Sequence, residues 1–164
     1  MTKVFHTPAV DKIMDEAMLL LQAGKGAQAE VLFRKALTLE PLTPDLLNNL
    51  AQALELQVLV DDGLCISETI LILFPDYLFA RATLATACMR DGDYEDALEL
   101  LTPLFARREF HISEYNVLCS VLIEYFLLTE NYPAARTWFD AWSGPDPKNP
   151  KLDVFRELLK KIGV

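Results

Sequence analysis

Apolar residues recur at i, i+3, i+4 and i+7 along most of the chain, and no segment alternates apolar and polar residues for long. This spacing is typical of amphipathic helices that bury one face. Glycine, proline and aspartate separate the periodic segments, so helices are expected over residues 9–21, 27–39, 44–56, 61–73, 78–90, 94–107, 113–129, 133–142 and 150–162. The pattern therefore predicts an all-α chain built of helix pairs.

Local signals mark several helix boundaries. Thr7 can cap the first helix, and Pro8 occupies its first position, where a missing N–H costs nothing. Pro103 is expected to kink or shorten the sixth helix. Residues 143–149 have the composition of a linker, after which Asn149 can cap the last helix.

A period of 34 residues runs through the helix pairs. It relates Ala17, Ala51 and Ala85 in the first helices of successive pairs. It also relates Ala29, Gly63 and Ala97 in the second helices, Gly24, Val58 and Gly92 at the turns, and Pro41 and Pro75 at the ends of pairs. Antiparallel helices approach closely where small residues stand at the crossing, so these positions are expected to be buried contacts.

With these residues the chain resembles the tetratricopeptide repeat family. The repeats would be 10–43, 44–77 and 78–111, followed by a degenerate unit at 112–147, whose first helix is expected to be a turn longer, and a capping helix at 150–162. Glu16 and Ser67 depart from the family pattern, which prefers leucine and an aromatic residue there. The resemblance implies one domain over residues 1–164, folded as a right-handed superhelical solenoid of helix hairpins.

The resemblance also implies where a ligand would bind, because the first helix of each pair lines the concave face in this family. The implied peptide-binding residues combine apolar and amide side chains. They are Met14, Met18, Asn48, Asn49, Gln52, Glu55, Phe79, Thr83, Thr86, Arg90, Asn116 and Ser120. Methionines at this helical spacing, such as Met14 and Met18, are more often core residues than ligand contacts, and Asn48 and Asn49 can equally be ordinary solvated polar positions. A carboxylate clamp is not expected, because Met14, Phe79 and Thr83 replace its basic residues.

Composition narrows the function further. The 164 residues carry 24 acidic and 15 basic side chains, a formal charge of −9, which disfavours nucleic acid and anionic membranes as partners. Two histidines, six glycines and no phosphate-binding loop disfavour an enzyme, and no cofactor or metal is expected. His111 and Cys119 lack a third group to orient them, and Arg107 and Arg108 are interpreted as a solvated helix end. Three cysteines at wide spacing and the absence of a secretory signal in the first residues indicate a soluble, cytoplasmic protein.

The leading hypothesis is therefore a protein–protein interaction module that holds a peptide or partner segment in its groove. One alternative is a chaperone for an exported protein, similar to those of type III secretion; another is a scaffold within a larger assembly. Homo-oligomers are possible. Trp138 and Trp142, four residues apart, are expected to pack against the capping helix, with an exposed interface there as the other interpretation.

Overall fold

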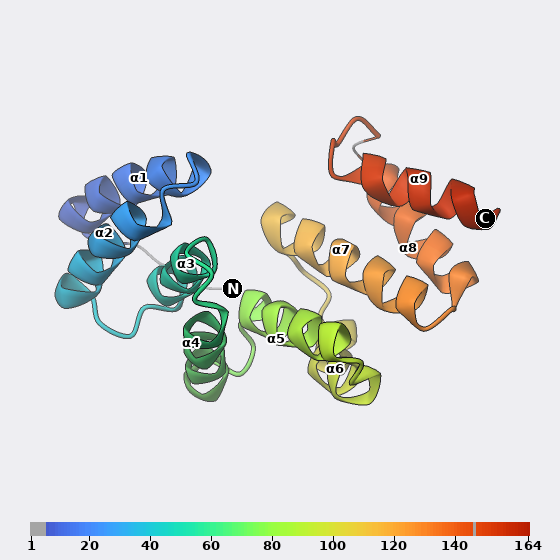
Figure 1. Cartoon of the computed structure of the whole chain (residues 1–164), viewed down its shortest axis with the longest axis horizontal. Coiled ribbons are helices and arrows are strands. Elements are labelled where there is room, and N and C mark those ends of the chain that lie inside the picture. Colours follow the sequence, from blue (N-terminus) through green and yellow to red (C-terminus); the bar gives the residue numbers. More distant parts are fainter. Residues whose placement is uncertain (1–5, 146) are drawn as a thin grey trace. The chain divides into compact units, whose positions relative to one another are not determined.

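The computed structural model describes residues 6–145 and 147–164, so the residues from which we inferred the absence of a secretory signal lie partly outside it, as does Asp146 of the linker. Over the described residues the chain forms nine α-helices, one short 3-10 helix and no strand, which confirms the predicted all-α class (Figure 1). The helices are α1 Pro8–Gln22, α2 Gly26–Leu39, α3 Pro44–Glu55, α4 Val60–Leu73, α5 Leu78–Asp91, α6 Tyr94–Leu101, α7 Ile112–Leu128, α8 Tyr132–Ser143 and α9 Leu152–Ile162, with the 3-10 helix η1 at Thr102–Ala106.

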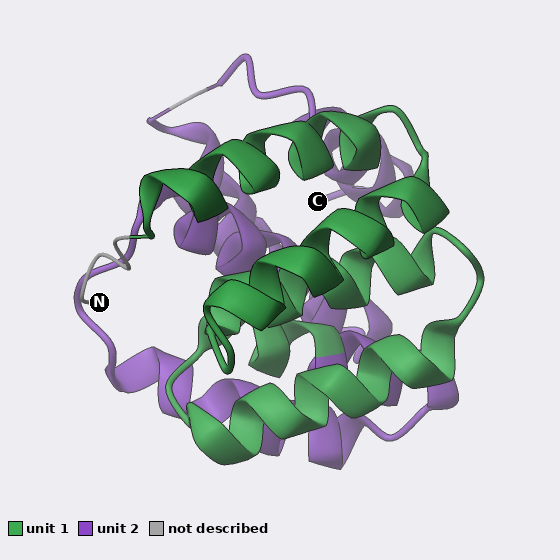
Figure 2. Cartoon of the chain, turned by 90° about the vertical axis from the view of Figure 1, so that its left-hand side faces the viewer, with its two compact units in different colours: residues 1–83 green, residues 84–164 purple. Residues whose placement is uncertain are grey.

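The helices form two compact units (Figure 2). Unit 1 ends at Thr83 and holds α1 to α4 with the first turns of α5. Unit 2 begins at Leu84 and holds the rest of α5 and the elements up to α9. The single solenoid over residues 1–164 and its handedness stay predictions.

The same left-handed turn closes each helix hairpin. Gly24, Val58, Gly92 and Glu130 all have positive φ, between 57° and 89°. The residue after each of them donates its backbone N–H to a carbonyl five positions back, at 2.8 to 3.0 Å. This is the pattern that satisfies the last carbonyls of a helix before the chain reverses. The predicted equivalence of the first three positions is therefore a shared backbone conformation.

The small residues of the 34-residue period lie at buried helix contacts. Ala17 and Ala29 in unit 1, and Ala85 and Ala97 in unit 2, have no exposed surface. Gly63 in α4 lies so close to α3 that a Cβ would stand 3.2 Å from the carbonyl oxygen of Ala51. In the last hairpin Cys119 of α7 and Ala135 of α8 are likewise fully buried. α7 has 17 residues against 14 in α5, as expected for the degenerate unit.

The core of unit 1 joins the first hairpin to α3. Phe33 of α2 is fully buried among apolar residues of α1, α2 and α3, including Val10 and Leu46. α2 also approaches α3 through Gly26, where a Cβ would lie 2.6 Å from the carbonyl oxygen of Ala53. Only glycine fits this contact without a shift of the backbone. α1 and α3 are thereby held as neighbours in unit 1.

The start of α1 is held by the end of α2 rather than by the side chain of Thr7. Thr7 is the N-cap residue, but its side chain makes no bond to the helix. Instead the Thr7 N–H and hydroxyl donate to Glu40 at 2.7 and 2.9 Å, and His6 Nδ1 lies 2.6 Å from the same carboxylate. The N–H of Thr7 holds the pKa of Glu40 below its ordinary value, with His6 contributing. Pro8 stands at the start of the helix as predicted.

In unit 2 a partly buried ion pair links the end of the 3-10 helix to α7. Pro103 falls in η1, so α6 is shortened as predicted. Arg107 is not a solvated helix end: its Nη2 donates to both carboxylate oxygens of Glu114, at 2.9 and 2.8 Å. Glu114 is 1% exposed and also accepts the N–H of His111, the N-cap of α7. Arg108 remains exposed.

Trp142 fastens the last three helices of unit 2 together. Its side chain is 2% exposed, its ring lies 6.0 Å from that of Phe155 in α9, and its Nε1 donates to Asn116 Oδ1 of α7 at 2.9 Å. The packing against α9 follows the prediction. The N-cap of α9 is Lys151 rather than Asn149, because the Asn149 side chain accepts the N–H of Lys151 in the turn before the helix.

Candidate functional site

Two neighbouring helices of unit 1 present a repeated stripe of side chains, which we name the α1–α3 face. Each stripe follows the spacing i, i+3, i+4, i+7, which puts its members on one side of a helix. The two stripes are related by the 34-residue period. The α1–α3 face consists of Asp11, Met14, Asp15 and Met18 of α1 and Asp45, Asn48, Asn49 and Gln52 of α3.

The face contains both core and surface residues. Met14 and Met18 are partly buried and pack against the core of unit 1, so each serves the core while keeping part of its surface available. Asn48 is only 7% exposed, Asn49 is half-buried and Gln52 is exposed. Methionine adapts to apolar side chains of different shapes, which suits a surface of this kind.

The amides of α3 are not used to hold the fold. Within residues 6–145 and 147–164, the side chains of Asn48, Asn49 and Gln52 make no hydrogen bond. Arg107 Nη1 is the one buried side-chain polar atom without a partner among the described residues, so the amide atoms of Asn48 and Asn49 still reach the surface. Each of these side chains offers donors and an acceptor, the complement of a peptide backbone. Asp45 differs, since it accepts the hydroxyl of Tyr77 at 3.2 Å.

The three other predicted binding residues of unit 1, which are Phe79, Thr83 and Glu55, differ in how far they are buried. Phe79 is half-buried, and its ring lies 5.5 Å from that of Tyr77 in an apolar cluster with Ile70 and Ala80. Thr83 is half-buried and Glu55 is exposed. Phe79 therefore has a packing role that explains it without a ligand.

The predicted binding residues of unit 2 differ from one another in burial and in hydrogen bonding. Thr86 and Arg90 are exposed, and Ser120 is half-buried. Asn116 is half-buried, and its Oδ1 is engaged by Trp142. Asn116 therefore braces α7 against α8, and its carbonyl oxygen is already used.

Three acidic residues on the first helices of the pairs were not predicted as site residues from the sequence. Asp11 and Asp15 lie three residues before Met14 and Met18, so helical spacing from those methionines could have identified them. In unit 2, Glu124 of α7 is half-buried, and burial raises the pKa of its carboxyl above the ordinary value. No hydrogen bond or ion pair to Glu124 occurs among the residues that the structure describes.

The alternative chemistries find no support in the geometry. Cys119 is fully buried, and burial raises the pKa of its thiol to about 11, the opposite of an activated nucleophile. His111 Nδ1 lies 2.8 Å from Ser113 at the start of α7. Among the described residues no group of three or more His, Cys, Asp or Glu side chains could hold a metal ion. None of the described helices has the length and hydrophobicity that crossing a bilayer requires.

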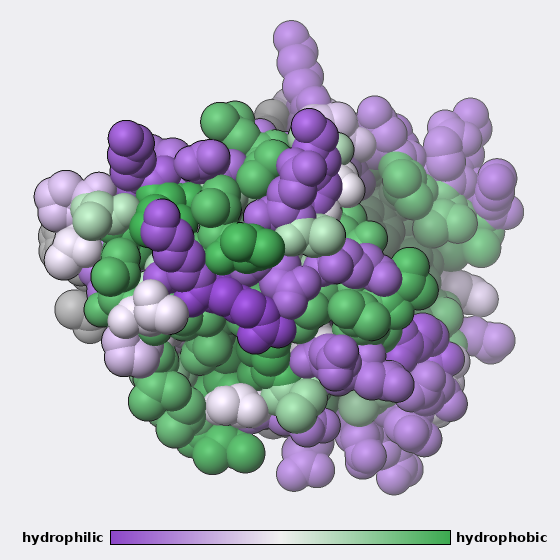
Figure 3. Space-filling view, turned by 60° about the vertical axis from the view of Figure 1, so that its left-hand side comes forward, coloured by the Kyte–Doolittle hydropathy of each residue, from purple (hydrophilic) through white to green (hydrophobic). Residues whose placement is uncertain are grey.

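Apolar side chains also reach the surface outside the α1–α3 face. Figure 3 shows hydrophobic residues interleaved with hydrophilic ones on one side of the molecule. In unit 1 the most exposed are Val58, Ile72, Leu19, Val31 and Leu42. They lie on several helices and turns, and scattered apolar residues are normal on soluble domains.

Comparisons with known proteins agree with this geometry. The chain matches a model described as tetratricopeptide repeat over residues 14–65 and 82–150, which is most of its length. A search of the curated proteins gives no match.

Several solved structures share the fold. The tetratricopeptide repeat domain of Sgt2 from Aspergillus fumigatus is 22% identical, with 70% of this chain and 78% of that chain covered and a TM-score of 0.57. A tetratricopeptide repeat protein from Parabacteroides merdae is 19% identical over 94% of this chain and 60% of that chain, with a TM-score of 0.58. MamA from Desulfovibrio magneticus RS-1 is 15% identical over 94% of this chain and 89% of that chain, also with a TM-score of 0.58. At these identities the likeness concerns the fold.

Proposed function

Because this chain belongs to the tetratricopeptide repeat family, whose domains generally serve protein–protein interaction and are typically non-catalytic, we propose that it binds a peptide segment of a partner protein on the α1–α3 face. The observation that carries the proposal is the set of unused amides on α3. Asn48 is 7% exposed and Asn49 is half-buried, and their amide groups make no internal hydrogen bond while still reaching the surface, so they are available to a ligand. A peptide backbone lying along the face would replace the water at these amides.

Apolar contacts complement these amides. Met14 and Met18 of α1 present flexible thioether side chains next to the core. A bound segment would rest apolar side chains on them while its backbone meets α3. The three free cysteines, of which Cys65 is exposed, support a reducing compartment such as the cytoplasm as the place of this interaction.

The test begins with selection of binders to the full chain from a random peptide library. The selected peptides are then titrated against the Asn49→Ala, Gln52→Ala double variant by fluorescence anisotropy. Loss of two hydrogen bonds of about 0.5–1.5 kcal/mol each predicts weakening of roughly fivefold or more. The melting temperature should change little, because neither side chain makes an internal bond.

The matched control is Gln28→Ala, which removes an exposed amide from α2, the second helix of the first hairpin. It should leave every affinity unchanged. Peptides that bind the double variant as tightly as the parent protein would contradict the proposed site. The Trp142→Ala variant does not test a surface, because Trp142 is buried in the core of unit 2.

A further inference from the structure

We propose that the partner segment bound by the α1–α3 face is basic and extended, with Lys or Arg side chains that meet Asp11 and Asp15. This inference rests on the proposed function and adds the chemistry of the partner. It begins with the two aspartates, which lie one helical turn apart on α1 and are both exposed. Like charges at i, i+4 repel each other, so the pair lowers the stability of an isolated helix rather than raising it.

The two aspartates are not held in ion pairs by the described part of the protein. Lys12, the sole base of α1, lies three residues before Asp15 and therefore beside it on the helix surface, but it forms no ion pair with Asp15 and lies about 160° from Met14. α3 contains no Lys or Arg. Asp45, the equivalent of Asp11 in the next repeat, adds a third carboxylate to the face.

Asn48 is the second observation that points to a ligand. Its side chain is more than nine-tenths buried and has no hydrogen-bonding partner among the described residues. It lies in the same stripe as Asp45, one helical turn before exposed Gln52. The first turn of a helix favours aspartate, which accounts for Asp11 and Asp45 on electrostatic grounds alone. That preference explains neither Asp15 nor the Asn48 side chain, which is more than nine-tenths buried and makes no internal hydrogen bond.

The amides also indicate the conformation of the bound segment. Backbone N–H and C=O groups inside a helix are already paired, whereas those of an extended segment are free to bond side-chain amides. An extended segment places alternate side chains on opposite sides. One set can therefore meet Met14 and Met18 while basic residues of the segment reach Asp11 and Asp15.

Three labelled peptides of about nine residues, roughly 30 Å when extended, test the inference. They share the same leucine positions and carry lysine, serine or glutamate at all others. Fluorescence anisotropy with the full chain should show the lysine peptide binding at least about tenfold more tightly than the glutamate peptide, with the difference shrinking between about 50 and 300 mM salt. The Asp11→Asn, Asp15→Asn variant should lose at least about fivefold for the lysine peptide and nothing for the serine peptide. Its melting temperature should change little, because the lost interaction of Asp11 with the helix dipole opposes the relieved repulsion between the two carboxylates.

Glu16→Gln is the matched control, because it removes an exposed charge from the same helix outside the face. It should leave all three affinities unchanged. Equal losses in the control and in the aspartate variant would assign the attraction to the net charge of −9 and overturn the inference. Equal binding of the lysine and serine peptides, still weakened by Asn49→Ala and Gln52→Ala, would overturn it and leave the proposed function standing. Binding of none of the three, while library-selected peptides still bind through Asn49, would do the same.

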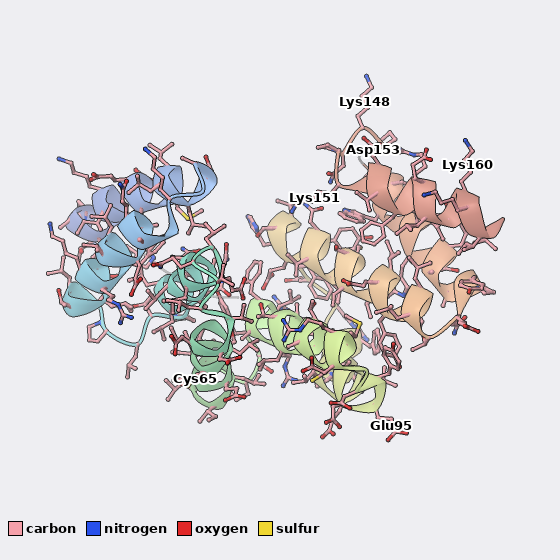
Figure 4. All side chains as sticks on the ribbon, viewed as in Figure 1. Cys65, Glu95, Lys148, Lys151, Asp153 and Lys160 are labelled. Atoms are coloured by element: carbon pink, nitrogen blue, oxygen red, sulfur yellow. The ribbon has the colours of Figure 1, made fainter. Side chains whose placement is uncertain are left out.

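A separate sedimentation experiment tests whether the α1–α3 face binds a second copy of this chain. Lys148 and Lys160, two of the basic residues near the C-terminus, project away from the ribbon of unit 2 (Figure 4). If sedimentation showed salt-sensitive dimers that Asp15→Asn abolishes, a second copy would be the occupant, and the inference of a separate partner would be wrong.

Discussion

At the scale of single residues, the four hairpin turns show that backbone geometry is held more strictly than residue type. Glycine occupies the left-handed position at Gly24 and Gly92, but Val58 and Glu130 adopt the same conformation. A β-branched residue at positive φ is strained by contact between its Cβ and the backbone. Val58 is also 82% exposed, so it gains little from burial in return.

Val58→Gly is therefore expected to stabilise the protein by about 1 kcal/mol, since glycine adopts positive φ freely. The gain is read from urea unfolding followed by circular dichroism. The same substitution at Val31, an exposed position inside α2, should instead cost about 0.5–1 kcal/mol, because glycine disfavours a regular helix. A Val58→Gly variant that unfolds at lower urea than the parent would show that the turn is not strained.

Glu124→Gln should raise stability at neutral pH. Burial raises the pKa of this carboxyl in the folded state, so the folded protein holds the proton more strongly than the unfolded chain. The unfavourable contribution is absent below the pKa of the unfolded chain and appears as pH rises through the folded pKa. The gain, below about 1 kcal/mol for a half-buried group, should thus vanish at acidic pH. Unfolding curves of both proteins across this pH range check it, and a gain that persists in acid would assign it to packing.

At the scale of helices and hairpins, the small residues of the 34-residue period set how closely neighbouring helices pack. Ala51 is 3% exposed, and its carbonyl lies 3.2 Å from the position that a Cβ on Gly63 would occupy. A side chain at Gly63 would therefore press on the α3 backbone and require it to shift by a few tenths of an ångström. Because these residues are regularly spaced, the positions of the crossings could be predicted from the sequence alone.

Ala51→Phe should overpack this crossing and cost about 1–3 kcal/mol. Ala27→Phe, at an exposed position near the start of α2, supplies the matched control and should have little effect. Thermal unfolding compares the two variants with the parent protein. A phenylalanine tolerated at both positions would mean that the register assigned to α3 is wrong.

Local sequence patterns predicted the helices and turns. The side-chain contacts that they did not predict involve residues further along the chain. Helical spacing, Pro103 and the turn positions gave the hairpins and the shortened α6. Thr7 and Arg107 were misinterpreted because Glu40 and Glu114 lie beyond the local window, the former 33 residues away. The repeat register predicted which side of α3 carries the amides but not the burial of Asn48, and the engagement of Asn116 depends on Trp142, 26 residues further along.

At the scale of the whole molecule, both units carry acidic side chains that contribute to the negative net charge. The chain carries a formal charge of −9, and several of its ion pairs, such as Arg34 with Glu30 and Arg136 with Asp140, are exposed pairs within one helix. Exposed pairs of this kind add little stability. Repulsion among the surplus carboxylates should therefore outweigh them at low ionic strength.

Moderate salt is accordingly expected to stabilise the protein. Raising sodium chloride from about 10 to about 150 mM shortens the screening length from about 30 to 8 Å, and the urea midpoint should rise. Choline chloride at the same ionic strength should give the same rise, because screening does not depend on the cation. A midpoint that falls with salt would show that attraction, not repulsion, dominates the surface.

The sequential packing of the helices also bears on how the chain acquires its structure during synthesis. α1 packs on α2, α2 on α3 and α3 on α4, so in unit 1 each helix meets a partner that has just been made. Chains dominated by such local contacts fold quickly, and domains begin to fold while the ribosome is still adding residues. The first hairpin can close once Glu40 has emerged to hold Thr7. The aspartates and amides of the α1–α3 face would then be assembled while unit 2 is still being translated.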